Sequence, residues 1–541
     1  MLIVAPAHAS ARLGAPDAAR TYVEARAAAM SGEHARAAQL LAALAQAQPQ
    51  QVDIARKALS EAIGSGQMDL ALGLCRAMPP GKLPGDARLL LAGAEIRRGN
   101  PDRALPWLTP SGDNGDLTFL APLIRAWSAA DRGNIDQAIA TLDQLPSNSL
   151  LLPMMPEERA FLLLKARRTA EAEPLVRQVV GHAGSREQRL RLGFADAFLA
   201  AGDRQRALMI IEGMGEGEGA ARRRIMAGRT GGLAVDNLPK AYAEVINAFA
   251  SDLMRVQRAA PPIGLVQISR FVDPQNSSTT SLLGLLLSRE DRDEEALALL
   301  RSVPLSDPLI AQVRDVQIRI LNGNKKFDEA YRIASSAAAD RNAEPTDFSR
   351  LGDVLQAMKR PSDAASAYGR AIALAQAQKQ RSDLWTLMLL RANALEDANR
   401  WPEARQTLQQ ALAIAPDQPL LLNFMGYGEL ERGENVDAAE AMIRKASELA
   451  PDDASITDSL GWAEFKRGKV DEAIGTLQRA AEKDPDQAEI QEHLGDALYR
   501  SGRRYEARFA WNAALVTAEE DIATRVRAKL VSGLTAANAA P

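Results

Sequence analysis

The sequence has one cysteine, Cys75, and aromatic residues make up only 4% of its 541 residues. A single thiol excludes an intrachain disulfide. The four histidines are far apart from one another, and none has a cysteine or carboxylate at zinc-ligand spacing. We therefore predict a small buried thiol at Cys75 and no metal or cofactor. One cysteine fits a reducing compartment, and it also fits a periplasmic protein without cross-links. The histidines are predicted to be ordinary surface or helix residues: His8, His34, His182 and His493.

The sequence also lacks a large excess of basic or acidic residues, and it lacks long apolar runs. The 65 basic and 69 acidic residues give a net charge of −4, which does not favour a nucleic-acid-binding protein. No apolar run approaches the roughly 18–20 residues that cross a bilayer, so no transmembrane segment is predicted. Runs of β-branched residues are nearly absent while alanine is abundant, and this composition favours helices.

The first ten residues, MLIVAPAHAS, resemble the end of an export signal. An apolar patch is followed by Ala7-His8-Ala9, the A-x-A form that precedes signal cleavage. The basic segment and the longer apolar stretch of a complete signal are missing. We interpret residues 1–9 as a truncated signal-peptide remnant, which predicts a periplasmic protein. The alternative is an ordinary frayed terminus and a cytoplasmic protein.

A spacing of about 34 residues recurs along the chain. With Ala473 as the reference, an alanine stands at nearly every multiple of this step, and the longest step is 40 residues. A degenerate copy is marked by Pro262. The alanine marks are Ala37, Ala71, Ala104, Ala138, Ala172, Ala207, Ala296, Ala330, Ala364, Ala404, Ala439, Ala473 and Ala507.

Each position of a unit has a physical reason, as residues 460–485 illustrate. Gly468 ends the first helix, because glycine tolerates the left-handed backbone of a helix exit. Ala473 lets the second helix approach the first closely, and Leu477 continues its apolar stripe. Pro485 cannot continue the helix and marks the break before the next unit. The unit is a helix–turn–helix that buries its apolar stripe only by stacking on neighbours.

The pattern resembles the tetratricopeptide repeat (TPR) family over roughly residues 20–515, most strongly over 345–515. The consensus aromatic residues of the first helix are mostly replaced, for example by Thr457 and Glu464. The resemblance implies an all-α fold, an α-solenoid forming a right-handed superhelix of about fourteen units.

The repeats predict the following division of the chain. We expect a TPR-like array of about six degenerate units at 10–212, a Gly-rich and basic insertion or hinge at 213–239, an array of about eight units at 240–515, a capping helix at 516–534 and a disordered tail at 535–541. The run Arg222-Arg223-Arg224 in the insertion is interpreted as a solvated charge run, and the alternative is a docking patch for an acidic partner.

In the TPR family the first helix of each unit lines a concave groove that binds partners. Carried to the last three units, the family's ligand-contacting positions imply a groove that is aromatic and acidic. Its carboxylates would repel a peptide carboxylate, so basic or apolar segments are favoured. The alternative is that the aromatic residues only pack between adjacent first helices. The implied residues are Asn423, Tyr427, Asp458, Trp462, Phe465, Glu492, Asp496, Tyr499 and Arg500, with Leu430, Glu431 and Lys466 beside them.

These observations predict a non-enzymatic scaffold or adaptor that binds proteins or peptides, with no catalytic residues. Taken whole, the chain resembles long periplasmic bacterial TPR proteins, some of which bring envelope proteases to their substrates, so a protease-adaptor or envelope-assembly role is one implied function. A cytosolic regulatory TPR protein is the alternative. An enzyme within the array is a remote one, because the segments outside the repeats are too short for a catalytic domain.

Overall fold

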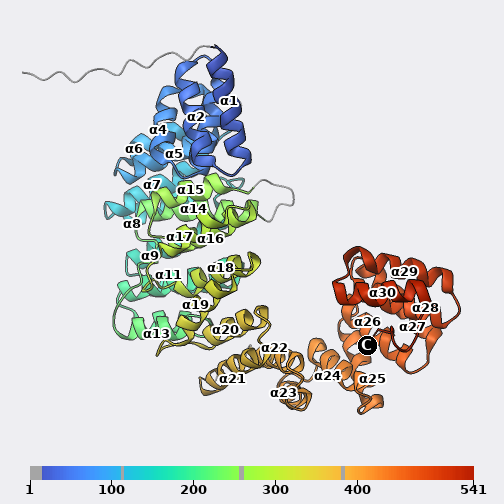
Figure 1. Ribbon diagram of the computed structural model, residues 1–541. Helices are drawn as coiled ribbons and strands as arrows, with labels where there is room; N and C mark the ends of the chain where they lie inside the picture. Colours follow the sequence, from blue (N-terminus) through green and yellow to red (C-terminus); the bar gives the residue numbers. More distant parts are fainter. Residues whose placement is uncertain (1–14, 111–114, 255–260, 379–383, 541) are drawn as a thin grey trace, which may run out of the picture. The chain divides into compact units, whose positions relative to one another are not determined.

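The computed structural model describes residues 15–110, 115–254, 261–378 and 384–540. Within these ranges the backbone forms thirty α-helices and short 3-10 turns, with no β-strand (Figure 1). The predicted all-α solenoid is confirmed. The predicted signal remnant at 1–9 lies outside the described residues.

The chain divides into two compact units, unit 1 up to Glu344 and unit 2 from Pro345. Unit 1 holds nine helix pairs and the single helix α13. Its helices are α1 (Ala15–Met30), α2 (His34–Ala47), α3 (Val52–Gly64), α4 (Met68–Ala77), α5 (Gly85–Arg97), α6 (Pro101–Ala104), α7 (Ala121–Asp131), α8 (Ile135–Asp143), α9 (Met155–Lys165), α10 (Thr169–Gly181), α11 (Glu187–Ala200), α12 (Arg204–Ile211), α13 (Glu218–Met226), α14 (Leu238–Leu253), α15 (Ile263–Val272), α16 (Ser277–Arg289), α17 (Asp293–Arg301), α18 (Ile310–Gly323) and α19 (Phe327–Ala338).

Unit 2 holds five helix pairs and a final single helix, α30. Its helices are α20 (Pro345–Ala357), α21 (Pro361–Ala377), α22 (Leu384–Asp397), α23 (Trp401–Ile414), α24 (Pro419–Glu431), α25 (Val436–Leu449), α26 (Ala454–Lys466), α27 (Val470–Lys483), α28 (Ala488–Arg500), α29 (Arg504–Thr517) and α30 (Glu520–Ser532).

The repeat register appears in the structure as a buried alanine after a left-handed turn. All thirteen alanine marks have no exposed surface. The turn residue before each has a positive φ, and this holds even where no glycine stands there, as at Lys359 and Asn399 with φ of 57°. The copy marked by Pro262 differs, because Pro262 precedes α15 and is only half-buried.

The first glycine of a unit is where the two helices touch. A Cβ built on Gly461 of α26 would lie 2.7 Å from Leu477 Cγ and 3.2 Å from the Leu477 backbone nitrogen of α27. The same residue of the next unit, Gly495, faces Trp511. Glycine at this position therefore sets how closely the paired helices approach.

The glycine-rich insert is built into unit 1, so the prediction that it divides the chain is wrong. Asp196 of α11 accepts hydrogen bonds from the backbone nitrogens of Gly231 and Leu233 at 2.8 and 3.0 Å. Glu344 accepts one from Gly217 at 2.8 Å. These carboxylates hold both ends of the insert, and the division falls after Glu344 instead.

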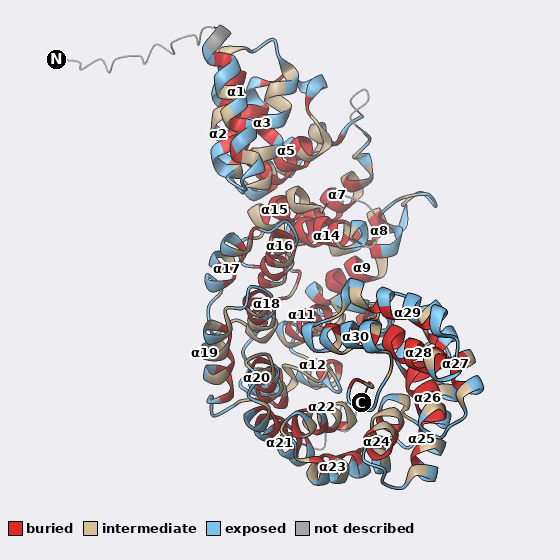
Figure 2. Ribbon diagram, turned by 45° about the vertical axis from the view of Figure 1, so that its right-hand side comes forward, coloured by how far each residue is buried: buried red, intermediate tan, exposed pale blue. Residues whose placement is uncertain are grey.

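After the insert, helices α14 and α15 pack against earlier first helices of unit 1. α14 packs on α5 and α7, and α15 packs on α3 and α5; Figures 1 and 2 show both beside α7. The Tyr242 hydroxyl of α14 donates to the Leu89 carbonyl at 2.9 Å. Nine of the 13 residues of α5 are buried, which is typical of a helix covered on all sides. The face that a partner would use in an open array is therefore filled by the chain itself here.

The last described residues are packed rather than disordered, contrary to the prediction for the tail. Asn538 and Ala540 are buried, and the Ala540 backbone nitrogen donates to Asp496 Oδ2 at 3.1 Å. The Asn538 side chain bonds the Gly533 carbonyl at 2.9 Å. Residues 533–540 thus close over α28 together with α30.

Candidate protein-interaction face

Two of the implied groove residues, Glu492 and Asp496, are paired with basic side chains of the same chain. Both have no exposed surface, and the Lys529 ammonium of α30 lies 2.6 Å from Glu492 Oε1 and 2.7 Å from Asp496 Oδ2. Arg525 adds a second ion pair to Glu492 at 2.9 Å. The expectation that these carboxylates face a partner is wrong for this structure, because α30 lies on the first-helix side of α28.

The two carboxyls of this contact respond differently to it. Burial raises the pKa of Asp496 and outweighs the attraction of Lys529. Burial acts on Glu492 as well, but hydrogen bonds from Arg525 and Lys529 together lower its pKa. The pair of cations therefore holds Glu492 as a carboxylate inside the protein.

The implied residues Asp458 and Trp462 are also buried. Trp462 is 1% exposed and stacks on the ring of His493 at 4.1 Å and on Phe465 at 4.8 Å. His493 Nδ1 lies 2.9 Å from Asp458 Oδ2. Packing between first helices, the alternative interpretation of the aromatic residues, is thus what the structure shows for Trp462. His493 is a helix residue of α28, as one of the two predicted alternatives has it, but it is buried and does not lie at the surface.

This cluster shifts the titration of its histidine. Burial lowers the pKa of His493, but Asp458, and then Glu489 and Asp496, raise it above its usual value overall. Its Nε2 is buried and has no hydrogen-bond partner among the described residues. The cluster holds α26 and α28 together and leaves little of itself to a ligand.

The remaining implied residues are accessible. Asn423, Tyr427, Phe465 and Tyr499 are half-buried, and Arg500 is exposed. The Asn423 side-chain oxygen is buried without a hydrogen-bond partner in the part of the chain that is described.

Tyr427 lies in an acidic environment. Burial, and then the charges of Glu431, Glu489, Asp458 and Glu396, raise the pKa of its phenol. These four carboxyls come from α22, α24, α26 and α28, so the first helices of unit 2 gather negative charge around one ring.

Sequence reasoning missed the groove positions in the two units that precede the unit of Tyr427. Asp353 and Asp397 are exposed, and Glu396 is half-buried and pairs with Arg432 at 3.1 Å. The sequence contains a signal for these residues. Ala392 stands twelve residues before the mark Ala404, as Gly461 stands before Ala473, so the groove positions one, four and five residues after Ala392 can be identified. We call the accessible set Asp353, Asn393, Glu396, Asp397, Asn423, Tyr427, Glu431 and Glu489 the acidic face.

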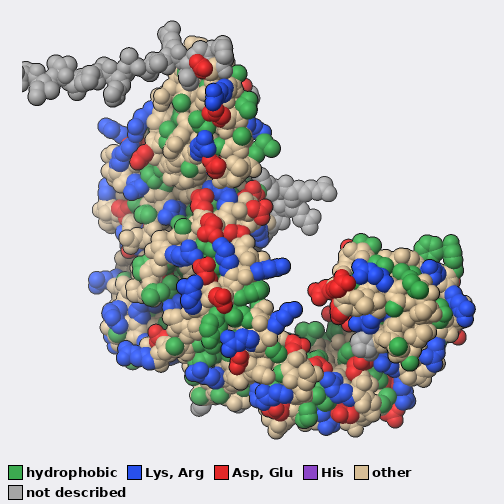
Figure 3. Space-filling model, viewed as in Figure 1, with side chains coloured by type: hydrophobic (Ala, Val, Ile, Leu, Met, Phe, Trp, Pro, Cys, Tyr) green, Lys and Arg blue, Asp and Glu red, His purple; other side chains and the backbone are tan. Residues whose placement is uncertain are grey.

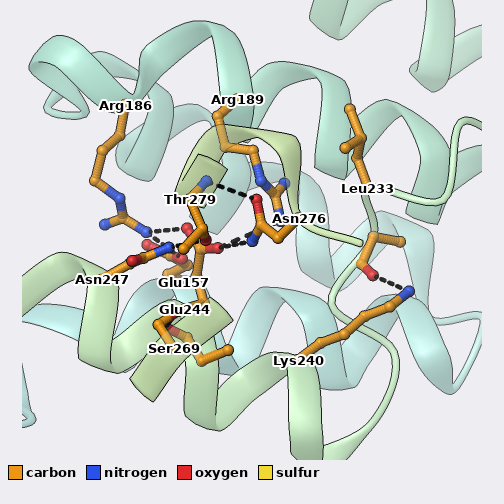
Figure 4. Close-up of polar contacts among 12 residues, drawn as sticks. Glu157, Arg186, Arg189, Leu233, Lys240, Glu244, Asn247, Ser269, Asn276 and Thr279 are labelled. Atoms are coloured by element: carbon orange, nitrogen blue, oxygen red, sulfur yellow. Dashed lines mark hydrogen bonds and ion pairs between the residues drawn. The ribbon is translucent and has the colours of Figure 1, made fainter. Parts of the chain in front are cut away.

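Unit 1 contains a buried polar network that sequence reasoning also missed. The Arg186 guanidinium lies 2.8 Å from both Glu157 Oε1 and Glu244 Oε1, and Arg189 lies 3.3 Å from Glu244 Oε2 (Figure 4). Asn276, at the start of α16, donates to Glu244 at 3.5 Å. These residues come from helices before the glycine-rich insert and from helices after it. The network therefore fixes how α14 and α16 dock on α9 and α11.

The structure also bears on the Cys75 thiol, on metal ligands and on membrane-spanning helices. Cys75 is buried, as predicted, and burial raises the pKa of its thiol to about 12. The described residues contain no group of histidine, cysteine and acidic side chains that could hold a metal ion. No helix within the described ranges is long and apolar enough to cross a membrane.

Comparison with known proteins gives family matches confined to unit 2. A TPR repeat model matches residues 461–502, and a tetratricopeptide repeat model matches residues 349–419. No curated protein matches the chain.

Several solved structures are distantly similar. The chain is 15% identical to a chain of the APC/C hetero-tetramer Cut9–Hcn1 over 96% of both chains, with a TM-score of 0.38. It is 21% identical to a thermophilic TPR protein of Thermus thermophilus over 35% of this chain and 99% of that one, with a TM-score of 0.30. It is 17% identical to YrrB, a TPR protein with an unusual peptide-binding site, over 36% and 97%, with a TM-score of 0.27.

Proposed function

Because the chain is a tetratricopeptide repeat protein, we propose that it is a non-enzymatic scaffold that binds a segment of another protein on the acidic face of unit 2. The observation that carries the proposal is the contrast between covered and uncovered first helices. In unit 1, α5 is covered by α14 and α15, and at the end of unit 2, α28 is covered by α30. The side chains of Asp353, Asn393 and Asp397, on α20 and α22, remain exposed within unit 2.

The chemistry of the acidic face favours a basic segment with apolar residues. Carboxyls surround the half-buried Tyr427 ring, and Lys or Arg side chains would pair with them while their aliphatic stems cover the ring. A segment that ends in a carboxylate would meet repulsion instead.

The experiment compares two labelled peptide probes, one alternating lysine and leucine and one alternating glutamate and leucine, by fluorescence anisotropy on the full chain. We expect the lysine peptide to bind and the glutamate peptide not to. The variant Asp397→Lys with Glu489→Lys should weaken binding at least about tenfold, since both residues are exposed and their loss leaves the helices intact.

The matched control is the double variant Asp437→Lys with Glu448→Lys on α25, where both residues are exposed and the Asp437 side chain is 89% exposed. It removes the same charge from a second helix and should leave affinity unchanged. Equal binding of both peptides, or equal weakening by the control, would show non-specific charge attraction and would refute the assignment of the acidic face.

We extend the proposal to the cell envelope, where the protein would present a protease or an assembly complex to its partner. Support comes from Ala7-His8-Ala9 in the sequence and from the resemblance to periplasmic TPR proteins. Fractionation of cells that express the protein from its native locus tests it. Recovery in the cytoplasmic fraction alone would support the alternative, a cytosolic regulatory TPR protein.

A further inference from the structure

Helix α29 carries an apolar stripe that points away from its own core. Tyr505, Phe509 and Val516 are 76%, 63% and 81% exposed, in a chain where aromatic residues are scarce. The rings of Tyr505 and Phe509 meet edge to face with centroids 5.0 Å apart. On the opposite side of the helix, Trp511 is fully buried. α29 thus has two apolar sides, of which unit 2 covers only one; Figure 3 shows hydrophobic side chains at the surface of this end.

The stripe runs the length of the helix. Residues 505, 509, 512 and 516 follow the spacing of one helical face, and α29, with 14 residues, is about 21 Å long. Near its centre stand the small residues Asn512 and Ala513, both exposed. Small residues at a crossing point let two helices approach closely.

Charge is distributed unevenly along the same helix. Arg504 and Arg508 are exposed near its beginning, next to an ion pair of Arg503 with Glu506, and Arg508 also donates to the Leu530 carbonyl at 2.7 Å. Glu519, Glu520 and Asp521 are exposed just after its end. Two such helices side by side in antiparallel order bring the basic end of each over the acidic end of the other. In parallel order, like charges would meet.

We propose that α29 is a self-association surface on which a second copy of this chain docks antiparallel about a two-fold axis near Asn512 and Ala513. Phe509 of one copy packs on Val516 of the other, and Arg504 and Arg508 of each copy face the acidic turn of its partner. Such an interface uses the same patch twice, as two-fold contacts do.

The dimer is weak, because one helical stripe lies at the low end of interface sizes. It leaves the acidic face of unit 2 open, since that face belongs to the first helices and the stripe to a second helix. A dimer therefore presents two acidic faces to a partner with repeated basic segments, which raises apparent affinity through avidity.

The experiment is sedimentation equilibrium of the full chain from about 1 µM to about 1 mM, a range that covers weak self-association. Wild-type protein should show a monomer–dimer equilibrium that weakens with salt. Phe509→Glu should raise the dimer dissociation constant at least about tenfold. Leu449→Glu, at an apolar residue of α25 that is 46% exposed, is the control and should leave the equilibrium unchanged.

Two charge variants make the test specific for antiparallel order. Arg504→Glu with Arg508→Glu makes both ends of the stripe acidic, and Glu520→Arg with Asp521→Arg makes both ends basic. Each variant alone should be monomeric, and an equimolar mixture should associate again, since each end then meets its opposite charge.

Several outcomes would overturn the proposal. A wild-type chain that stays monomeric over the whole range would leave the stripe to another kind of partner, and a dimer unaffected by Phe509→Glu would place the contact elsewhere. A mixture of charge variants that does not associate would refute antiparallel pairing. Circular dichroism confirms the fold of each variant.

Discussion

Substituting Gly461 by alanine tests the helix contact on which the repeat register depends. Alanine is favoured over glycine inside a helix by about 1 kcal/mol. Against this, the new Cβ would lie 2.7 Å from Leu477 Cγ, 2.9 Å from Cδ2 and 3.2 Å from the Leu477 backbone nitrogen. Carbon atoms in contact lie about 3.5–4.0 Å apart, so α27 itself must move. Overpacking of this kind costs about 1–3 kcal/mol, so after the gain in helix propensity we expect a net loss of up to about 2 kcal/mol.

The matched substitution is Gly475→Ala in α27, fourteen residues further on. A Cβ at Gly475 meets nothing within 4 Å, so only the gain in helix propensity remains, and we expect stabilisation by about 0.4–1 kcal/mol. Two glycines in the interiors of paired helices should therefore respond with opposite signs.

Hydrogen exchange followed by mass spectrometry is the suitable assay, because a long repeat array does not unfold in one step and exchange measures local opening. Gly461→Ala should speed exchange in α26 and α27 by a factor of up to about 30, and Gly475→Ala should slow it. If both substitutions slowed exchange, the first glycine would not be a contact point, and the reasoning about the register would fail.

Three further predictions concern buried ionisable groups. Lys529→Met should lower the free energy of local unfolding of α30 by about 3–5 kcal/mol, because it leaves the buried Asp496 without its cation, and unchanged exchange protection in α30 would contradict this. Burial, and then Glu157, hold the pKa of Glu158 well above its ordinary value, so the stability it contributes is complete below the unfolded value of 4.5 and is lost as pH rises through the folded value. Glu158→Gln should remove that loss in urea titrations from about pH 4 to about pH 8, and identical curves for both proteins would refute the assignment. The pKa of about 12 at Cys75 predicts that a thiol reagent at about pH 8 modifies only unfolded protein, and fast labelling of the native chain would show an accessible thiolate.

Much of the fold could be predicted from spacing alone. The thirteen alanine marks are buried without exception, and the turn five residues before most of them is left-handed whether or not glycine stands there. Both features are local, because they depend on two adjacent helices within one unit. Cys75 stands four residues after Ala71, as Leu477 does after Ala473, and this inward position of the unit accounts for its burial.

The implied binding residues could be predicted only in part. Position in the repeat correctly indicated that Tyr427 lies among carboxylates, but it could not show that Glu492 and Asp496 pair with Lys529 of α30. It also could not show that His493 lies beneath Trp462. These contacts join helices of successive units, 35 and 37 residues apart, and the repeat period places such helices side by side without specifying which side chains meet.

The sequence by itself determined a chain of paired helices, because the 34-residue spacing of small residues specifies each pair locally. Tertiary structure alone decided which first helices remain open. The return of α14 and α15 along α5, and the insertion of Lys529 against α28, depend on distant segments meeting. A carboxylate that one unit of the sequence offers to a partner is buried in the folded chain when a distant lysine of the same chain reaches it first.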